Sequence, residues 1–399
     1  MERPAPLMKN HFAARSRFLH SSPSGLVQFD EKQLESFLPL ARPDGNNEAV
    51  QRITYRVYLG AIRQFIHDHW EQFLEVLAGQ GLKDARNIHY IDIIAEKHGG
   101  DYHPARIKVQ AAAFRHSFAV NVALTPRGKP RVSQDFHLLA SLRERFPAKF
   151  TPEVYFLGVV NVQAKNEEDL VIVMFMGEWL DGYHEFHLSV EPESGKTGTI
   201  LWDLNRGYQF LSRDTTAEIF RQAALIMTSY YDTKTFAEVY PWHHAAGDFV
   251  VKYSEGIVDV KLITLRQHAP RMVFHEHSFR NRLTALMIFL ANLTVRMRLD
   301  RLDGVGEIVW AGDHAVDGAI RGFLAGMKAQ VASGMCDDML LGQFIEETKR
   351  MSPAEVAEIF QMVTEFCDGE APDSPVILDH LADHIFEVYR LFQELPSCL

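Results

Sequence analysis

The stretch Tyr240-Pro-Trp-His-His-Ala-Ala-Gly-Asp-Phe-Val-Val-Lys252 decides the fold that the sequence predicts. After its Gly-Asp pair, apolar residues at 249–251 and 257–263 flank a Ser-Glu-Gly turn, which is typical of a hairpin of two short strands. Before it, apolar residues recur at helical spacing over 219–230, behind a capping-box pattern. We therefore predict that Asp248 lies on a loop between a helix and a hairpin, where its carboxylate can act as a base.

This order of helix, Gly-Asp loop and hairpin resembles the catalytic segment of the protein-kinase-like phosphotransferases, with the aminoglycoside and choline phosphotransferases as nearest kin. The resemblance implies that Asp248 orients or deprotonates an attacking hydroxyl group. It also implies two magnesium-binding positions, at which this chain has Tyr253 and Thr264 in place of the family's Asn and Asp. ATP is thus the implied cofactor, and the missing ligands argue against a magnesium requirement.

The resemblance extends upstream and implies a small lobe whose strands and helix cover a nucleotide. Its expected strands are 88–95, 107–113, 118–124, 150–158 and 169–177, with a helix over 130–146. Glycine lets backbone amides approach an anion closely, so the loop after the first strand is the expected phosphate cover. In this chain that loop contains His98, Gly99 and Gly100.

Two further nucleotide-binding positions of the family are replaced in this chain. Asn121 stands where the family has a strand lysine, and Asp135 stands where the next helix has a glutamate. An amide cannot supply positive charge to a phosphate, although it can donate a hydrogen bond. Lys261 and Arg266, which flank the missing metal ligand, are candidate cations that could neutralise phosphate instead.

Each of these residues also has a structural interpretation. Asp248 could cap a turn beside Gly247, Gly99 and Gly100 could form a hairpin turn, and Asn121 could be a polar residue at a strand edge. The residue types alone leave both interpretations open for Asp248, whereas they favour the structural one for Asn121.

Histidine is abundant, with 19 residues in the chain, and several lie in tight groups. His184, Glu185 and His187 follow the expected hinge at 178–180, and we predict that they line the substrate cleft together with His244. A metal site is the alternative, but neither these groups nor His275-Glu276-His277 has a recognised metal-binding spacing. We therefore predict no metal ligand among them.

Composition excludes several classes of protein. The chain has 399 residues, is 47% hydrophobic and has a formal net charge of -11, which favours a large core and argues against nucleic-acid binding. Its three cysteines show no disulfide or zinc spacing, which fits a reducing cytoplasm. The longest apolar run, 285–293, is too short to cross a membrane. We predict a cytoplasmic protein that binds a small molecule and neither nucleic acid nor a membrane.

The predicted fold class is α+β, and the resemblance implies a bilobal arrangement. The small antiparallel-sheet lobe is expected at 86–178, and the mainly helical large lobe at 179–399 contains the catalytic-type hairpin at 247–264. Residues 1–48 are expected to form an N-terminal arm, and 49–81 an extra helix that could either brace the small lobe or make an oligomer contact. Apolar periodicity predicts C-terminal helices at 282–302, 315–332, 340–349, 353–367 and 376–395.

Three functions remain open at this point. The first is a divergent ATP-dependent phosphotransferase that acts on a small hydroxylated substrate, with Asp248 as the base. The second is a pseudokinase that binds a nucleotide or metabolite in a regulatory role. The third is a histidine-ligated metal enzyme. Phosphoryl transfer depends on positioning and charge stabilisation, so the loss of the metal ligands and of the strand lysine favours binding without turnover.

Overall fold

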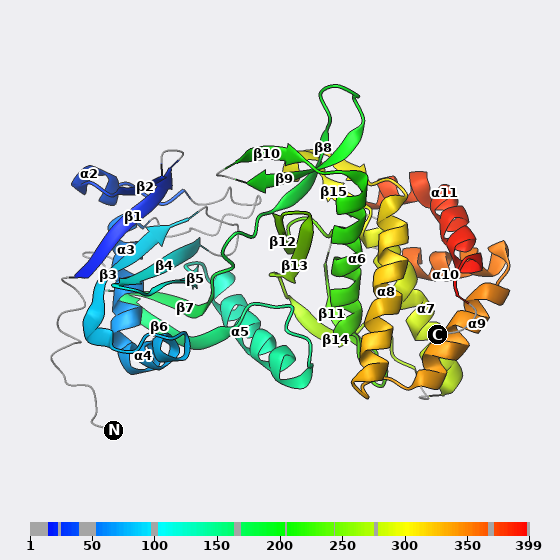
Figure 1. The fold of residues 1–399 in the computed structure, drawn as a ribbon, viewed down its shortest axis with the longest axis horizontal. Coiled ribbons are helices and arrows are strands. Elements are labelled where there is room, and N and C mark those ends of the chain that lie inside the picture. Colours follow the sequence, from blue (N-terminus) through cyan, green and yellow to red (C-terminus); the bar gives the residue numbers. More distant parts are fainter. Residues whose placement is uncertain are drawn as a thin grey trace. The chain divides into compact units, whose positions relative to one another are not determined.

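The fold is α+β, as predicted (Figure 1). The computed structural model describes residues 15–22, 25–39, 53–96, 103–162, 169–203, 206–242, 244–274, 278–365 and 371–396. The chain divides into two compact units, the first formed by residues 1–140 and 152–181 and the second by residues 141–151 and 182–399. The division after Asp181 lies close to the predicted boundary at 178, whereas residues 141–151 belong with the second unit.

A seven-stranded sheet forms the centre of the first unit, with the strand order β2-β1-β3-β4-β5-β7-β6. All neighbouring strands pair antiparallel except β1 and β3, which run parallel. The strands are β1 (Ser16–Ser22), β2 (Gly25–Gln28), β3 (Ile88–Ala95), β4 (His103–Ala111), β5 (Arg115–Ala123), β6 (Val154–Val162) and β7 (Leu170–Glu178).

The predicted strands of this sheet are present with shifted ends. β3 has the predicted bounds. β4 and β5 begin upstream of the predicted 107 and 118, because their antiparallel pairing runs from His103↔Val122 to Gln110↔Arg115. β6 begins at Val154, after the predicted start at 150. Phe150 belongs to the second unit, where its carbonyl accepts a hydrogen bond from the backbone N–H of Leu262 at 3.0 Å.

The segment expected as one helix over 49–81 contains two, α3 (Tyr55–Asp68) and α4 (Trp70–Gly79). The break is at His69, whose backbone angles of φ -104° and ψ 30° leave the helical region. Its ring Nδ1 lies 2.9 Å from the carbonyl oxygen of Phe65, which holds the side chain at the break.

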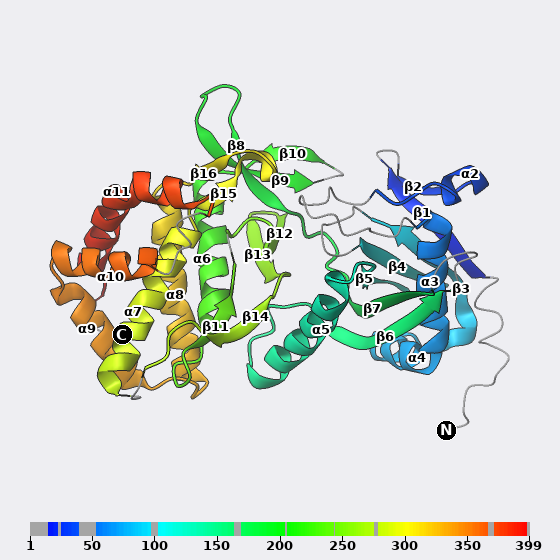
Figure 2. The same ribbon diagram turned by 180° about the vertical axis from the view of Figure 1, so that it is seen from behind.

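Helices α3 and α4 lie beside the sheet (Figures 1 and 2). Their apolar side chains belong to the core cluster that the sheet forms. Phe65 packs against Phe156 and Phe73 against Phe118, with ring centroids 5.2 and 5.7 Å apart. Both helical phenylalanines are fully buried. The two helices therefore brace the sheet of the first unit, which is one of the two roles expected for this segment.

The N-terminal arm expected at 1–48 contains a strand of the main sheet. β1 pairs with β3 in the register Arg17↔Asp92, and Arg17 Nε donates to Asp92 Oδ1 at 2.7 Å. Asp92 is only 1% exposed, so its charge requires this partner. A short helix, α2 (Glu31–Leu34), follows the β1–β2 hairpin, and a 3-10 turn, η1 (Ala85–Asn87), precedes β3.

Helix α5 (Gly128–Arg145) passes from the first unit to the second along the chain. In the second unit, helices α6 (Arg213–Ser229) and α8 (His314–Ala332) lie side by side (Figures 1 and 2). Gly318, Gly322 and Gly326 recur at one-turn spacing on the side of α8 that meets α6. A Cβ atom at Gly322 would lie 2.1 Å from the carbonyl oxygen of Arg221 on α6. These glycines therefore allow the two helix backbones to approach closely.

The remaining helices of the second unit agree with the predicted positions, with one correction. They are α7 (Phe279–Arg296), α9 (Asp338–Arg350), α10 (Pro353–Glu365) and α11 (Ser374–Gln393). The prediction of helix as far as 302 was wrong, because β15 (Leu299–Arg301) leaves the helix axis and pairs with β16 (Ile308–Trp310), with the 3-10 turn η2 (Leu302–Gly304) between them. Leu299 and Asp300 are both buried there.

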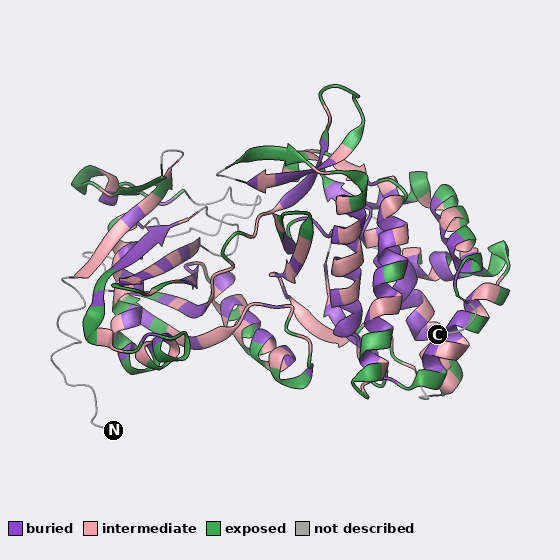
Figure 3. Cartoon of the chain, in the orientation of Figure 1, coloured by how far each residue is buried: buried purple, intermediate pink, exposed green. Residues whose placement is uncertain are grey.

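Short strands complete the second unit. The predicted hairpin is present as β12 (Phe249–Ser254) and β13 (Ile257–Leu262). Strands β8 (Phe186–Val190), β9 (Thr197–Asp203) and β10 (Gly207–Phe210) form a three-stranded sheet whose edge strand β10 is exposed along its length (Figure 3). A further pair joins β11 (Ala237–Tyr240) to β14 (Gln267–Pro270). Among the described residues, no helix is both long and apolar enough to span a bilayer.

Candidate functional site

The loop from His244 to Asp248 precedes the β12–β13 hairpin, as predicted, but it follows the short strand β11, which the sequence did not predict, rather than a helix. Gly247 has φ 85°, in the left-handed region that glycine adopts at no steric cost. The backbone N–H of Phe249 donates to the carbonyl of Ala245 at 3.1 Å and closes the turn. Asp248 is consequently only 5% exposed at the start of the hairpin.

The carboxylate of Asp248 is paired with a guanidinium group. Arg266 Nη1 lies 3.3 Å from Asp248 Oδ2, and Nη2 lies 3.3 Å from Oδ1, so both carboxylate oxygens accept from one side chain. Arg266 Nη1 also donates to the carbonyl of Pro241 at 3.0 Å, which anchors the side chain. The candidate base is therefore part of an ion pair and is not poised alone at the end of the loop.

The chain after the hairpin returns to Asp248 but carries no acidic side chain there. The backbone N–H groups of Ile263 and Thr264 point to the carbonyl of Asp248, at 2.9 and 3.4 Å. Tyr253, at the other position that the resemblance assigns to magnesium, pairs with Val258 across the hairpin. Lys261, the candidate phosphate-binding cation, places its Nζ 3.3 Å from the carbonyl of Lys149.

Two of the histidines predicted to line a cleft meet at one buried carboxylate. His187 Nδ1 lies 3.4 Å and His244 Nδ1 3.7 Å from the same oxygen, Oδ1 of Asp300. Asp300 also accepts from the backbone N–H groups of Leu188, at 2.6 Å, and Arg301, at 2.7 Å. Asp300 thus ties β8, β15 and the Asp248 loop together.

The other predicted cleft residues lie beside this cluster. His184 exchanges two backbone hydrogen bonds of 2.9 Å with Val251 of β12, and its Nε2 lies 3.7 Å from Asp203 Oδ2. Glu185 Oε2 lies 4.0 Å from His187 Nε2. His184, Glu185 and His187 thus lie on one segment at β8, and His187 and His244 approach each other at Asp300. That these four residues line a substrate cleft stays a prediction.

Asp300 was not identified as a site residue from the sequence. It lies in the stretch Arg296–Asp303, whose mixed charges are typical of the solvated end of a helix. The sequence offered one signal, the neighbouring pair Leu299-Asp300. In a strand these two side chains point to opposite faces, and here Asp300 faces His187 and His244. Only the loss of helix after Arg296 turns the carboxylate inward.

The His187 imidazole is enclosed and charged. Burial lowers its pKa, but hydrogen bonds to Asp300 and Glu185 outweigh burial and raise the pKa to about 9. The Trp202 ring lies 4.5 Å from the imidazole, and Gly304 approaches it so closely that a Cβ atom would lie 2.9 Å from the ring. His187 is therefore a buried imidazolium at neutral pH.

This charge makes stability depend on pH. Because the folded-state pKa is above the unfolded value of about 6.5, the stabilisation by His187 is complete below pH 6.5 and is lost as pH rises through about 9. We expect the wild-type protein to lose about 3 kcal/mol more than His187→Gln between pH 6.5 and 9.5. Urea unfolding at both pH values measures the difference, and parallel losses in the two proteins would rule out the charged imidazole.

In the first unit, the structure places Asn121 and Asp135 on neighbouring elements. Asn121 on β5 pairs with Phe175 of β7, and the Phe175 ring lies 5.8 Å from Phe136 of α5. Asn121 thus lies on the sheet face to which α5 contributes Phe136, and Asp135 precedes that residue and is buried. His98, Gly99 and Gly100 lie outside the described residues.

Within the part of the chain that the structure describes, no three His, Cys, Asp or Glu side chains are grouped as a metal ion requires. His243 and the segment 275–277 lie outside that part.

Comparison with known proteins gives no further assignment. No protein-family model matches the chain, and no curated protein is significantly similar to it.

Proposed function

We propose that this chain is a divergent kinase-like protein that binds a nucleotide or a similar phosphorylated small molecule without transferring the phosphoryl group. The observation that carries the proposal is the Arg266–Asp248 pair, in which one guanidinium engages both oxygens of the candidate base. A guanidinium presents paired donors that match phosphate oxygens as well as carboxylate oxygens. In this proposal Arg266 binds the phosphate group of the ligand, and Asp248 occupies the same guanidinium donors when no ligand is bound.

The order of elements supports the kinase-like part of the proposal. A mainly antiparallel sheet with one helix between β5 and β6 is followed by α6, the Gly247-Asp248 loop and the β12–β13 hairpin, and then by helices α7 to α11. The chain after the hairpin returns to Asp248 with Thr264 and Arg266, where the resemblance implies a metal-binding carboxylate. A fixed cation can neutralise phosphate charge there in place of a metal ion, but it cannot supply the coordination on which phosphoryl transfer relies.

Binding and turnover predict opposite effects of two substitutions. If Arg266 binds the phosphate, Asp248→Asn removes its competing anion and should strengthen ATP binding, whereas Arg266→Gln should weaken binding by about tenfold or more. Neither effect should require magnesium. Lys328→Gln, which replaces an exposed cation of α8, is the matched control and should leave binding unchanged.

The measurement is thermal unfolding of each variant with ATP, with and without magnesium, relative to its own midpoint without ligand. Ligand at about 100 times its dissociation constant stabilises a protein by roughly 2.7 kcal/mol, which raises the midpoint by a few degrees. Formation of ADP that requires magnesium and is abolished by Asp248→Asn would instead support a phosphotransferase acting on a small hydroxylated substrate. The absence of any nucleotide-dependent shift would contradict both forms of the proposal.

A further inference from the structure

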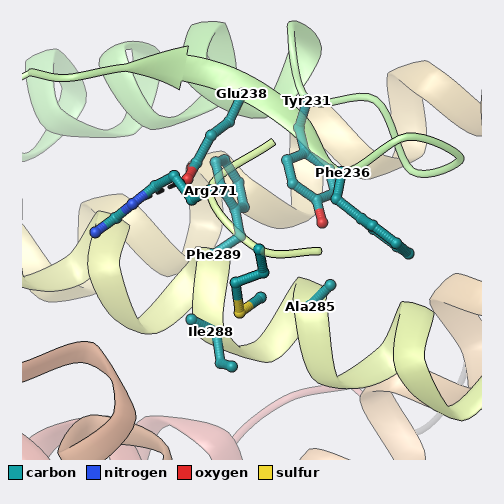
Figure 4. Close-up of a pocket in the computed structure, with 8 residues that line it drawn as sticks. Tyr231, Phe236, Glu238, Arg271, Ala285, Ile288 and Phe289 are labelled. Atoms are coloured by element: carbon teal, nitrogen blue, oxygen red, sulfur yellow. Dashed lines mark ion pairs between the residues drawn. The ribbon is translucent and has the colours of Figure 1, made fainter. Parts of the chain in front are cut away.

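A hollow in the second unit is too small to hold a ligand. Glu238 on β11 and Arg271, which follows β14, form its polar side, and its other walls are apolar or aromatic (Figure 4). The hollow has room for about one water molecule, which would donate a hydrogen bond to the buried Oε2 of Glu238. The feature of the second unit that points to a partner lies on its surface, at the strand β10.

The strand β10 forms one edge of the three-stranded sheet β8-β9-β10. Trp202 on β9 donates its backbone N–H to the carbonyl of Glu185 at 2.9 Å, on the β8 side, so it does not bond to Tyr208, the residue opposite it on β10. Because backbone groups alternate in direction along a strand, the N–H and C=O groups of Tyr208 and Phe210 point outward, away from β9. Within the described ranges, no backbone group meets them on that side.

The side chains of β10 continue a row of aromatic rings across the sheet. Tyr208 lies opposite Trp202, with ring centroids 5.7 Å apart, and the Trp202 ring lies 4.5 Å from that of His187. Tyr208 is 66% exposed and Phe210 38%, and both side chains lie on the same face of the sheet. Exposed aromatic side chains beside an open sheet edge indicate a surface that pairs with another chain.

The sequence of β10 contains nothing that would prevent such pairing. Natural proteins protect their edge strands with charged residues, with proline or with a bulge. β10 consists of Gly-Tyr-Gln-Phe, without charge or proline, and it pairs with β9 in unbroken register. An uncharged strand can pair with a second copy of itself without repulsion between like charges.

We propose that β10 pairs with β10 of a second copy of this chain, antiparallel about a two-fold axis at Gln209. In this register Tyr208 of each copy lies opposite Phe210 of the other, and the two residues exchange both N–H···O bonds through the groups that point outward. Their rings then form a cross-strand aromatic pair on one face. Arg206, just before β10, lies opposite Ser212, so no like charges meet, and the two three-stranded sheets become one.

The test is sedimentation velocity of the full chain without ligand, from low to high micromolar concentration. The contact is confined to short strands, so we expect a weak, reversible dimer with a micromolar dissociation constant. Tyr208→Pro should keep the protein monomeric, because proline removes an N–H group that only the second copy uses. Proline is tolerated where an edge strand faces solvent, so the fold should persist.

Leu26→Pro is the matched control for Tyr208→Pro. β2 is also an exposed edge strand, and Leu26 follows a glycine of positive φ, as Tyr208 does on β10. The Phe29 N–H donates to the carbonyl of Phe18 at 3.0 Å, so the alternation along the strand puts the Leu26 N–H on the outer side. Leu26→Pro should dimerise as the wild-type protein does.

A charge at the two-fold axis tests the register. Gln209→Glu and Gln209→Lys each place two like charges opposite each other, and each should weaken self-association about twofold to fivefold. An equimolar mixture of these two variants should recover the association of the wild-type protein. Because Gln209 is exposed, both should unfold near the wild-type midpoint, and they decide the outcome even if Tyr208→Pro does not fold.

Three results would overturn the proposal. The wild-type protein would remain monomeric at high micromolar concentration, or folded Tyr208→Pro would dimerise as strongly as Leu26→Pro. The third is a mixture of the two Gln209 variants that is no more dimeric than either variant alone.

Discussion

Replacing Asp300 with alanine should lower the free energy of unfolding by about 3–5 kcal/mol at pH 7. The substitution removes the carboxylate that accepts from the backbone of Leu188 and Arg301 and lies 3.4 Å from His187. It leaves a buried imidazolium, the buried N–H group of Leu188 and the part-buried N–H group of Arg301 without this partner, and the loss is costly for the buried groups. Urea denaturation at pH 7 measures the change.

A neighbouring acid and a second substitution make this prediction specific. Asp303→Asn changes an exposed carboxyl three positions away, at a residue with φ 51° that asparagine tolerates, and should cost less than about 0.5 kcal/mol. In a double-mutant cycle, His187→Gln should remove part of the cost of Asp300→Ala, because the buried cation is then gone. Additive losses would mean that the two side chains do not interact as described.

Gly322→Ala should be the second strongly destabilising substitution, at about 3 kcal/mol. The added methyl carbon would lie 2.1 Å from the carbonyl oxygen of Arg221, and neither backbone can yield without moving α8 away from α6. The higher helix propensity of alanine offsets only about 1 kcal/mol of this cost. Thermal or urea unfolding of the purified variant measures the net effect.

Gly342→Ala is the matched control for Gly322→Ala. Gly342 also lies inside a helix, α9, but a Cβ atom there meets nothing within 4 Å. Alanine should therefore stabilise the protein by about 0.5–1 kcal/mol at this position. If Gly322→Ala stabilises the protein as Gly342→Ala does, the backbones of α6 and α8 lie further apart than described.

Local sequence patterns predicted those helices and strands whose apolar residues recur with one clear period. The strand 88–95, the β12–β13 hairpin and most C-terminal helices were found near their predicted places, because each has a long apolar pattern of a single period. Strands β8 to β11 were not predicted, because short strands stabilised by distant partners resemble loops. β15 was assigned to a helix because Leu299 and Leu302 continue the helical spacing of α7.

The candidate site was predictable as a set of residue types but not as a set of contacts. The sequence identified Asp248, His187 and His244, whereas the partners Arg266 and Asp300 come from positions 18 residues downstream of Asp248 and 113 downstream of His187. Pairing over such distances is decided by the packing of whole elements. Lys261 and Arg266 were both plausible cations, and only the fold distinguishes the one that meets Asp248 from the one that meets Lys149.

The parallel pairing of β1 with β3 has a consequence for biosynthesis. Arg17 contacts Asp92 across 75 positions of sequence, with α3 and α4 between them. During translation, β1 emerges long before its partner strand exists, and the chain between them must close a long loop before the pairing is rewarded. We therefore expect β1 to dock late, although it is translated before β3, and to depend until then on protection from proteases and from pairing with other chains.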